Sequence, residues 1–394
     1  MTPLAVTAFS LASPLGSGTA ATLGALRARR GGLRPNDLEG APLETWIGRV
    51  AGVEQTPIGG DLAAFDCRNN RLAELGLRAD GFEDAVARAR GRYGARRIAL
   101  FLGTTTAGIA ETEKAFAQRG ADGALPGWFR YRETHNLFSL CDYVQRRLGL
   151  AGPAATVSTA CSSSAKVFAS AHRLIEAGFA DAAVVGGVDS LCLMTLYGFR
   201  SLELLSSTPC RPCDAARDGL SIGEAAGFAL LERPRPGERS LALLGYGESS
   251  DAYHMASPHP EGAGAADAMR SALERAGVEP AQVGYVNLHG TGTPSNDSAE
   301  DAAVFGLFGD AVPCSSTKGW TGHTLGAAGI AEAVISLLCV REGFIPGSLN
   351  VASLDPALKS RVAVAPQELP LKRVLSNSFG FGGNNCSLLL GTLA

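Results

Sequence analysis

The sequence predicts an α/β protein with two similar βαβ-type lobes, stacked so that helices and strands form α-β-α-β-α layers. Short β-branched runs alternate with longer alanine-rich stretches along the 394 residues, which is typical of layered α/β folds. Both halves of the chain repeat one order of strand, glycine- and threonine-rich turn, strand and helix. The helix expected at 162–177 is apolar around most of its circumference, so we expect it to be buried.

The first lobe is expected to span residues 1–240. A strand at 97–102 ends in GTTTAG, and a strand at 155–158 leads through TACSSS into the buried helix. Gly178 follows that helix, in the position where glycine commonly ends one, and the next strand is expected at 182–188.

The second lobe, residues 241–394, has the same order of elements. A strand at 283–288 ends in HGTGTPSND, and a strand at 312–315 leads to STKGWTGHTLGAAG. A helix at 330–340 follows and ends near a glycine. The last strands are expected on either side of FGFGGNN, at 374–379 and 386–390.

Composition excludes several classes of protein. Charged residues make up 19% of the chain, below the usual ~25%, which suggests that much surface is buried within or between subunits. The net charge is −3, so the sequence lacks the clustered basic surface of a nucleic-acid-binding protein. The basic stretches at 27–30 and 91–97 are either solvated surface or a dock for an acidic carrier protein.

The chain gives no sign of a membrane or secreted protein. No apolar run approaches 18 residues, and the first residues lack the pattern of a secretion signal. Nine scattered cysteines, an odd number, favour reduced thiols and a cytoplasmic location. Cys210 and Cys213 form a C-x-x-C pair, but no second ligand pair follows at a suitable spacing, so no metal site is expected.

Cys161 stands where a strand ends and the buried helix begins. Backbone N–H groups at a helix N-terminus stabilise an anion, so this position is expected to lower the pKa of the thiol. A thiolate there suits thioester exchange and covalent acyl transfer. The alternative is a buried structural cysteine, which is the common state of this residue type.

Two histidines and a lysine lie on glycine-rich segments of the second lobe. His289 ends a strand, and His323 stands five residues after Lys318 at the start of another helix. Singly, each could be a capping or surface residue. Together with Cys161, they are the parts needed for acyl transfer with carbanion stabilisation.

Four ordered blocks resemble the signature of one family. VSTACSSSAK, NLHGTGTPSNDSAE, SSTKGWTGHTLGAAGIAEA and NSFGFGGNN are similar to those of the elongating β-ketoacyl-acyl carrier protein synthases of the thiolase superfamily. The resemblance covers nearly the whole chain and implies a thiolase-like fold. It also implies a decarboxylative Claisen condensation of an acyl group on Cys161 with a malonyl group on acyl carrier protein, giving a β-ketoacyl thioester and CO₂.

The resemblance also assigns roles to single residues. Cys161 matches the acylated nucleophile, His289 and His323 the donors to the malonyl thioester oxygen, and Lys318 the lysine that positions His323. The backbone N–H groups of Cys161 and Phe379 would form the oxyanion hole. The remaining matches are Glu332, Asp297 and Glu300 as acidic supporting residues, Thr291 and Thr293 as phosphopantetheine-binding residues, and Phe379 as a gating aromatic.

The resemblance implies no tightly bound cofactor, because acyl carrier protein supplies the phosphopantetheine arm. It implies a homodimer, with a heterodimer with a ketosynthase-like chain-length factor as the alternative. A thiolase would need a second catalytic cysteine near the C-terminus, and Cys386 is more consistent with a core residue. An initiating ketosynthase would have asparagine where His323 stands, and a chain-length factor would lack Cys161.

Two features concern the substrate. GGNN replaces the GGTN that is frequent in the family, which favours a specialised pathway, such as aryl polyene or polyketide synthesis, over bulk fatty acid synthesis. Thr106 falls near a position that shapes the acyl pocket in relatives, where a small residue could admit a flat chain. The alternative is that Thr106 only caps a turn.

Overall fold

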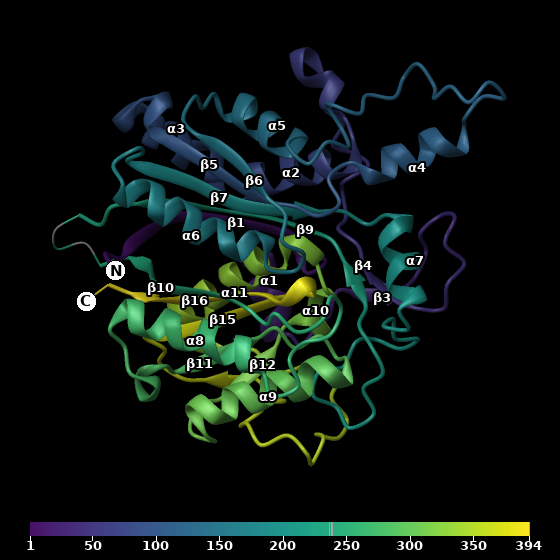
Figure 1. Ribbon diagram of the computed structural model, residues 1–394. Coiled ribbons are helices and arrows are strands. Elements are labelled where there is room, and N and C mark those ends of the chain that lie inside the picture. Colours follow the sequence, from purple (N-terminus) through teal and green to yellow (C-terminus); the bar gives the residue numbers. More distant parts are fainter. Residues whose placement is uncertain (236, 238, 394) are drawn as a thin grey trace.

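A computed structural model describes residues 1–235, 237 and 239–393, and its layers confirm the predicted α-β-α-β-α order (Figure 1). One sheet layer belongs to the first half of the chain and the other to the second half, and helices lie between them and outside both. The two layers are joined by a short antiparallel pairing between β1 and β10, at Leu4 with Leu243 and Ala5 with Ala242.

Each sheet layer has five main strands. In the first, the order is β1 (Leu4–Ser13), β9 (Ala225–Glu232), β7 (Ala182–Asp189), β5 (Ile98–Gly103) and β6 (Ala154–Val157). In the second, the order is β10 (Leu241–Ser250), β16 (Asn384–Thr392), β15 (Arg373–Gly380), β11 (Tyr285–Leu288) and β12 (Cys314–Ser316).

Two buried helices, α6 (Ser163–Glu176) and α11 (Ala328–Glu342), fill the middle layer. Every residue of α11 from Ala328 to Val340 is buried, because this helix packs against both sheets. The two helices approach so closely that a Cβ on Gly329 would collide with the backbone of Ala165. Gly329, the last glycine of the GHTLGAAG block, is therefore required for the central packing.

Helices cover both outer faces of the stack. On the first sheet lie α2 (Arg68–Arg78), α3 (Phe82–Tyr93) and α5 (Ser139–Leu148), and on the second lie α8 (Ala263–Ala276) and α9 (Pro294–Phe308). Two further helices, α4 (Ile109–Ala117) and α7 (Leu193–Ser201), contact each other at one side of the molecule. None of the described helices is long and apolar enough to cross a membrane.

The predicted elements all exist, and the differences lie at their ends. The strand expected from 312 begins at Cys314, since the preceding Pro313 has no N–H to donate to a neighbouring strand. The strand expected from 283 begins at Tyr285, because Val283 ends a short helical turn, η4 (Pro280–Gln282). The buried helix of the first half agrees with the prediction to within one residue at each end.

Candidate active site

Cys161 lies in the tight connection between β6 and α6, at the end of the molecule where the two halves meet. The preceding Ala160 has a left-handed backbone with φ 52°, which turns the chain sharply into the helix. The serines of the block secure this turn: Ser162 Oγ donates to the carbonyl of Thr159, and Ser163 Oγ donates to that of Ala160. Cys161 itself is only 7% exposed.

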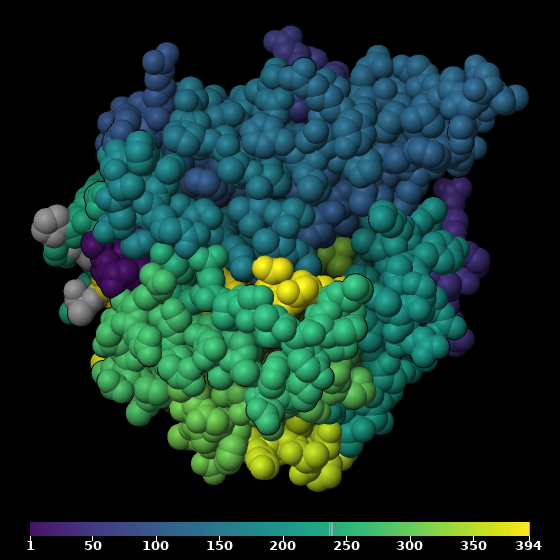
Figure 2. All heavy atoms as spheres, viewed as in Figure 1, coloured from purple at the N-terminus to yellow at the C-terminus, as the bar shows by residue number. Residues whose placement is uncertain are grey.

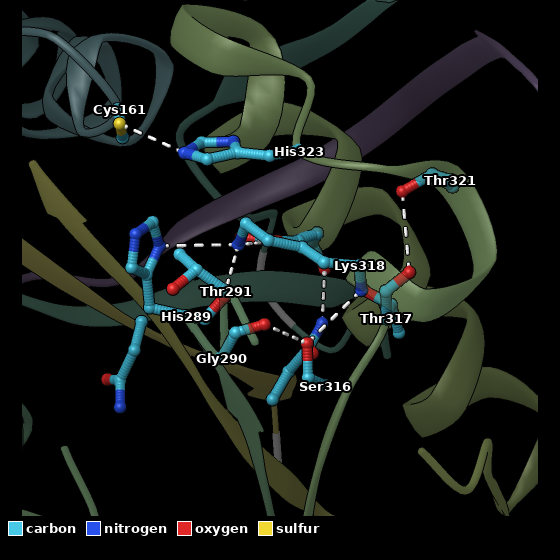
Figure 3. Close-up of polar contacts among 12 residues, drawn as sticks. Cys161, His289, Gly290, Thr291, Ser316, Thr317, Lys318, Thr321 and His323 are labelled. Carbon is cyan, nitrogen blue, oxygen red and sulfur yellow. Dashed lines mark hydrogen bonds and ion pairs between the residues drawn. The ribbon is translucent and has the colours of Figure 1, made fainter. Parts of the chain in front are cut away.

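His323 faces the sulfur directly (Figure 3). Its Nε2 lies 3.0 Å from Cys161 Sγ. Its Nδ1 accepts a hydrogen bond of 3.1 Å from the backbone N–H of Leu325. Because Nδ1 uses its lone pair there, the neutral ring carries its proton on Nε2 and presents an N–H to the sulfur. The backbone of His323 is fixed by a short strand, β8 (Ile222–Gly223), through a hydrogen bond from Gly223 N–H.

His289 directly follows β11, and a carboxylate holds its backbone. Glu300 Oε1 and Oε2 accept 2.8 Å hydrogen bonds from the backbone N–H groups of His289 and Gly290, respectively. The Nδ1 of His289 lies 3.2 Å from Lys318 Nζ. An ammonium group can only donate, so His289 also carries its proton on Nε2. The two imidazole rings are nearly perpendicular, with centroids 5.3 Å apart.

Lys318 contacts His289 and not His323, which corrects the role expected from the sequence. Its Nζ also donates to the backbone carbonyl of His289 and pairs with Glu332 Oε1. Lys318 and Glu332 are both almost completely buried. The ammonium group therefore acts on His323 only through space, while it holds the ring and backbone of His289 by direct contact.

Both active-site histidines are neutral at physiological pH. Burial lowers the pKa of each ring well below 6.5, and the charge of Lys318 lowers both further. Two neutral rings with their protons on Nε2 are therefore hydrogen-bond donors, and they remain so across the neutral range.

The pKa of the Cys161 thiol is raised to about 11, chiefly because the sulfur is buried. The prediction of a lowered pKa is therefore wrong. Lys318 and the backbone N–H of Phe381 lower the pKa, but by less than the loss of solvation raises it. The sequence correctly placed Cys161 beside the N-terminus of a helix, but it could not show how deeply the sulfur is buried.

The reactivity of Cys161 should follow this raised pKa. We expect the rate of Cys161 alkylation by iodoacetamide to keep rising, by about tenfold per pH unit, from pH 7 to beyond pH 9, since only the thiolate reacts. Peptide mass spectrometry of samples quenched at each pH measures the rate. A rate that levels off near pH 7 would contradict the raised pKa.

Two cavities meet at Cys161. One is a mostly enclosed channel with Cys161, His289 and His323 at its inner end and Thr291 and Thr293 along its wall. The hydroxyls of Thr291 and Thr293 lie 2.8 Å apart and form a polar patch on this wall. The other cavity, of about 450 Å³, opens to the surface and has a largely apolar wall: Ile109, Met194, Phe199, Leu202, Leu325 and Phe381.

Phe381 is the functional candidate that the sequence analysis missed. It lines both cavities, and its ring stacks on Phe199 at 5.6 Å. Its backbone N–H hydrogen-bonds the Cys161 sulfur and lowers the pKa of that thiol. Phe379 lies against His289 with ring centroids 6.0 Å apart. In Figure 2 the yellow segment that contains the 380–383 turn reaches the surface between the two halves. The sequence analysis chose Phe379 from the FGFGG segment, and only the geometry shows the role of Phe381.

Thr106 caps a turn, so the prediction that it shapes the acyl pocket is not supported by its position. Its hydroxyl and its N–H both donate to Asp189 Oδ1, at 3.0 and 2.9 Å, and it is 1% exposed. The neighbouring Thr105 lines the apolar cavity instead.

The acidic residues that follow His289 support its loop from outside the channel. Glu300 holds the backbone of His289, as described above. Asp297 accepts hydrogen bonds from the N–H groups of Cys213, at 2.9 Å, and Gly292, at 3.2 Å. Burial raises the pKa of both carboxyls, that of Glu300 to about 7.

The sulfur and the two histidines form a cluster that could be mistaken for a metal site. Ligand atoms of Cys161, His289 and His323 lie within 4.8 Å of one another. A histidine that binds a metal through Nε2 normally donates its Nδ1–H to an acceptor. Here both Nδ1 atoms face donors, a backbone N–H and an ammonium group. The donor set therefore does not fit a metal ion.

The buried pair of Lys318 and Glu332 should make a large contribution to stability. We expect Lys318→Met to lower the free energy of unfolding by about 3 kcal/mol near pH 8, because Glu332 would be left as an unpaired buried carboxylate. Burial already raises the pKa of Glu332 to about 7, and losing the ammonium raises it further. A raised pKa adds stability that is lost as pH rises through it, so the defect should shrink near pH 5. Urea denaturation at both pH values measures it.

A matched control is Lys114→Met, which removes an exposed pair with Glu111 and should change the free energy of unfolding by less than about 1 kcal/mol. Equal losses in the two variants would contradict the stated role of the buried pair.

Comparisons with known proteins show the family of the chain. The family model "Beta-ketoacyl synthase, N-terminal domain" matches residues 1–236, and the corresponding C-terminal domain model matches residues 241–352. A 3-oxoacyl-(acyl-carrier-protein) synthase 2 of Rhizobium meliloti is 41% identical over 266 residues, which are 63% of this chain and 62% of that protein. The mitochondrial 3-oxoacyl-(acyl-carrier-protein) synthase of Arabidopsis thaliana is 39% identical over 271 residues, 64% of this chain and 59% of that protein. The chain thus matches less than two thirds of the length of these curated relatives.

A solved structure matches over a longer range. The ketosynthase in complex with its chain length factor from Xenorhabdus doucetiae has a TM-score of 0.91 and 40% identity, and the match covers 100% of this chain and 98% of that one.

Proposed function

Because this chain belongs to the β-ketoacyl synthase family, we propose that it is a decarboxylating ketosynthase that extends acyl groups carried on Cys161. One observation carries the proposal: two neutral imidazoles present Nε2–H groups to a channel that a cysteine thiol also lines. A pair of neutral donors beside a nucleophile suits a reaction in which negative charge develops first on one thioester oxygen and then on another.

In the first half-reaction, Cys161 sulfur attacks the carbonyl carbon of an acyl thioester. The N–H of Phe381 and the Nε2–H of His323 stabilise the thiolate as the thiol loses its proton. The N–H groups of Cys161 and Phe381 then bind the oxyanion, with Phe381 in place of the Phe379 expected from the sequence. The bond from the acyl carbon to the carrier sulfur breaks, and that sulfur leaves as a thiol after it takes up the proton lost by Cys161. The acyl group remains on the Cys161 sulfur with its chain in the apolar cavity.

In the second half-reaction, a malonyl thioester occupies the channel lined by Thr291 and Thr293. Its carbon–carbon bond to the carboxylate breaks, CO₂ leaves, and the electron pair forms an enolate. His289 and His323 donate to the enolate oxygen, where the exclusion of water strengthens both hydrogen bonds. The enolate carbon attacks the acyl carbon on Cys161, and the sulfur leaves as the β-ketoacyl product forms.

The alternative of a thiolase-type reaction has less support. A thiolase needs a second cysteine to remove a proton from its acyl donor. Among the described residues that line the channel, Cys161 is the only cysteine, and Cys386 lies in β16 with no exposed surface. A role as a non-catalytic chain-length factor is disfavoured by the presence of Cys161 together with both histidines.

We infer acyl carrier protein as the partner that delivers both substrates through its phosphopantetheine arm, with no tightly bound cofactor on this chain. A second ketosynthase-like subunit, either another copy or a chain-length factor, is also proposed. Support comes from the related complex with a chain length factor and from exposed apolar residues near the open acyl cavity, Met194 at 63% and Leu202 at 49%. The nine free thiols are consistent with the cytoplasm.

The test is reconstitution with a panel of acyl carriers, a malonyl carrier and the candidate partner subunit. The carrier is analysed by intact-mass spectrometry. We expect the acyl chain to gain one two-carbon β-keto extension and CO₂ to be released. The chain lengths and the saturation that are accepted would then separate a fatty acid pathway from an aryl polyene or polyketide pathway. No extension with any acyl donor, alone or with the partner, would overturn the proposal.

A further inference from the structure

Asp189, the last residue of β7, is a fully buried carboxylate that the proposed chemistry does not use. Its two carboxylate oxygens accept hydrogen bonds from groups on two separate loops. The first loop, which follows β5, supplies the hydroxyls of Thr104, Thr105 and Thr106 and the N–H groups of Thr105 and Thr106. The second supplies the N–H of Gly326, at 2.6 Å from Oδ2.

The second of these loops positions His323. Gly326 belongs to the helical turn η5 (Leu325–Ala327), and Leu325 within it has a left-handed backbone with φ 54°. This conformation of a leucine is strained and persists only when its surroundings fix it. The strained residue is the one whose N–H donates to His323 Nδ1 and so selects the Nε2–H form. Asp189 fixes the next peptide along the chain.

The first of these loops forms part of the acyl cavity. Thr105 lines that cavity, and its hydroxyl and N–H both donate to Asp189. Leu325 lines the same cavity from the opposite loop. One carboxylate therefore holds two walls of the acyl cavity and the turn that orients a catalytic ring.

We propose that Asp189 is a positioning residue of the condensation step, which holds the His323–Gly326 turn against the acyl-cavity wall so that His323 points its Nε2–H at the reacting atoms. This inference rests on the proposed ketosynthase function. A positional error of about 1 Å in such a group can reduce a rate by about 100-fold, so even a small movement of the turn should lower the rate of condensation.

The informative substitution is Asp189→Asn, which keeps the shape and removes one acceptor. If the amide oxygen takes the Oδ1 position, it retains the threonine donors there. The amide NH₂ then faces the N–H of Gly326, where two donors meet. The threonine hydroxyl of Thr105 can rotate to accept, but the backbone N–H cannot. The hydrogen bond to Gly326 is thus the one that asparagine breaks.

For Asp189→Asn we expect kcat for condensation to fall about tenfold, with a smaller fall in the rate of Cys161 acylation. The charge of Asp189 also raises the pKa of Cys161, so the midpoint of the pH profile for Cys161 alkylation should move to lower pH in this variant. A general loosening of the fold would also lower the pKa of Cys161, because it would expose the sulfur to solvent. The shift is therefore assigned to the lost charge only if a variant that disturbs the same turn but keeps the carboxylate shows none.

A second variant separates position from charge and protects the test if Asp189→Asn fails to fold. In Gly326→Ala, the new Cβ would lie 2.7 Å from Asp189 Oδ2 and push the turn away while the carboxylate stays. We expect a similar loss of condensation with no shift in the alkylation midpoint. The control is Glu74→Gln, a buried carboxylate that binds Tyr143 and Arg147 away from the site, which should leave both readouts unchanged.

The positioning role would be overturned if Asp189→Asn and Gly326→Ala both condensed as fast as the wild-type protein, in an assay in which the wild-type protein is active. Equal loss of acylation and condensation in both variants would also overturn it, since that pattern indicates a structural role only. Absence of condensation by the wild-type protein would instead refute the proposed function.

Discussion

Replacement of Cys161 by alanine should abolish both the acyl-enzyme adduct and condensation, a loss of at least about 1000-fold in kcat. The sulfur is the only cysteine sulfur among the described residues of the channel wall, and both cavities end at it. No neighbouring group can replace it as an acyl carrier, because the two histidines present N–H groups and not lone pairs to the channel.

The same variant should still release CO₂ from a malonyl carrier. His289 and His323 stabilise the enolate without using the sulfur, so the decarboxylation step keeps its donors. Intact-mass spectrometry of the protein measures the adduct, and labelled CO₂ measures decarboxylation. The matched control is Cys141→Ala, which alters another buried cysteine, in α5, and should retain both activities. Normal condensation by Cys161→Ala would refute covalent catalysis by this residue.

His323→Ala should show the complementary defect. Condensation is expected to fall about 100- to 1000-fold, the usual effect of removing one donor to a developing oxyanion. Acylation of Cys161 should be less affected, since its oxyanion is bound by backbone N–H groups that the substitution leaves in place. A single-turnover assay that follows acyl-enzyme formation and product formation separately measures the two steps.

The control for this variant is His172→Ala. His172 is also buried and hydrogen-bonded, but it lies in the second half of α6 and contacts the carbonyl of Thr2 and the ring of Tyr246. It should condense at close to the wild-type rate once the folded fraction is taken into account. If His323→Ala lost acylation as completely as condensation, the assignment of His323 to the second half-reaction would be wrong.

The layers of the fold and the grouping of Cys161, His289 and His323 at one site could be predicted from the sequence. Glycine-rich turns after buried strands place polar side chains at one end of a layered sheet, and the apolar helix at 162–177 places Cys161 beside them. The GTTTAG turn can also be recognised in the sequence, but the direction of its side chains cannot. Both Thr105 and Thr106 donate their hydroxyls to Asp189, a carboxylate 84 and 83 residues away in the chain, and of the two only Thr105 also lines the acyl cavity.

Contacts between distant segments explain the other errors. Lys318 is close to His323 in sequence, yet it reaches His289, because the short helix α10 (Lys318–Thr321) turns its side chain toward β11. The pKa of Cys161 depends on how much protein covers the sulfur, and neighbouring residues in the sequence do not report that. The sequence analysis chose Phe379, which lies within β15 and pairs with Asn385 of β16, whereas the backbone N–H that bonds the sulfur belongs to Phe381, just beyond the strand.

The central claim is that the acyl group on Cys161 becomes bonded to the carbon left by malonyl decarboxylation. It is tested most directly by isolating the acylated enzyme, mixing it with a malonyl carrier labelled at the methylene carbon, and analysing both proteins by intact-mass spectrometry. We predict that Cys161 loses its acyl group as the carrier gains a β-ketoacyl chain that contains both the acyl group and the labelled carbon. Labelled acetyl carrier beside an enzyme that remains acylated, or acyl transfer to a carrier without the labelled carbon, would contradict this account.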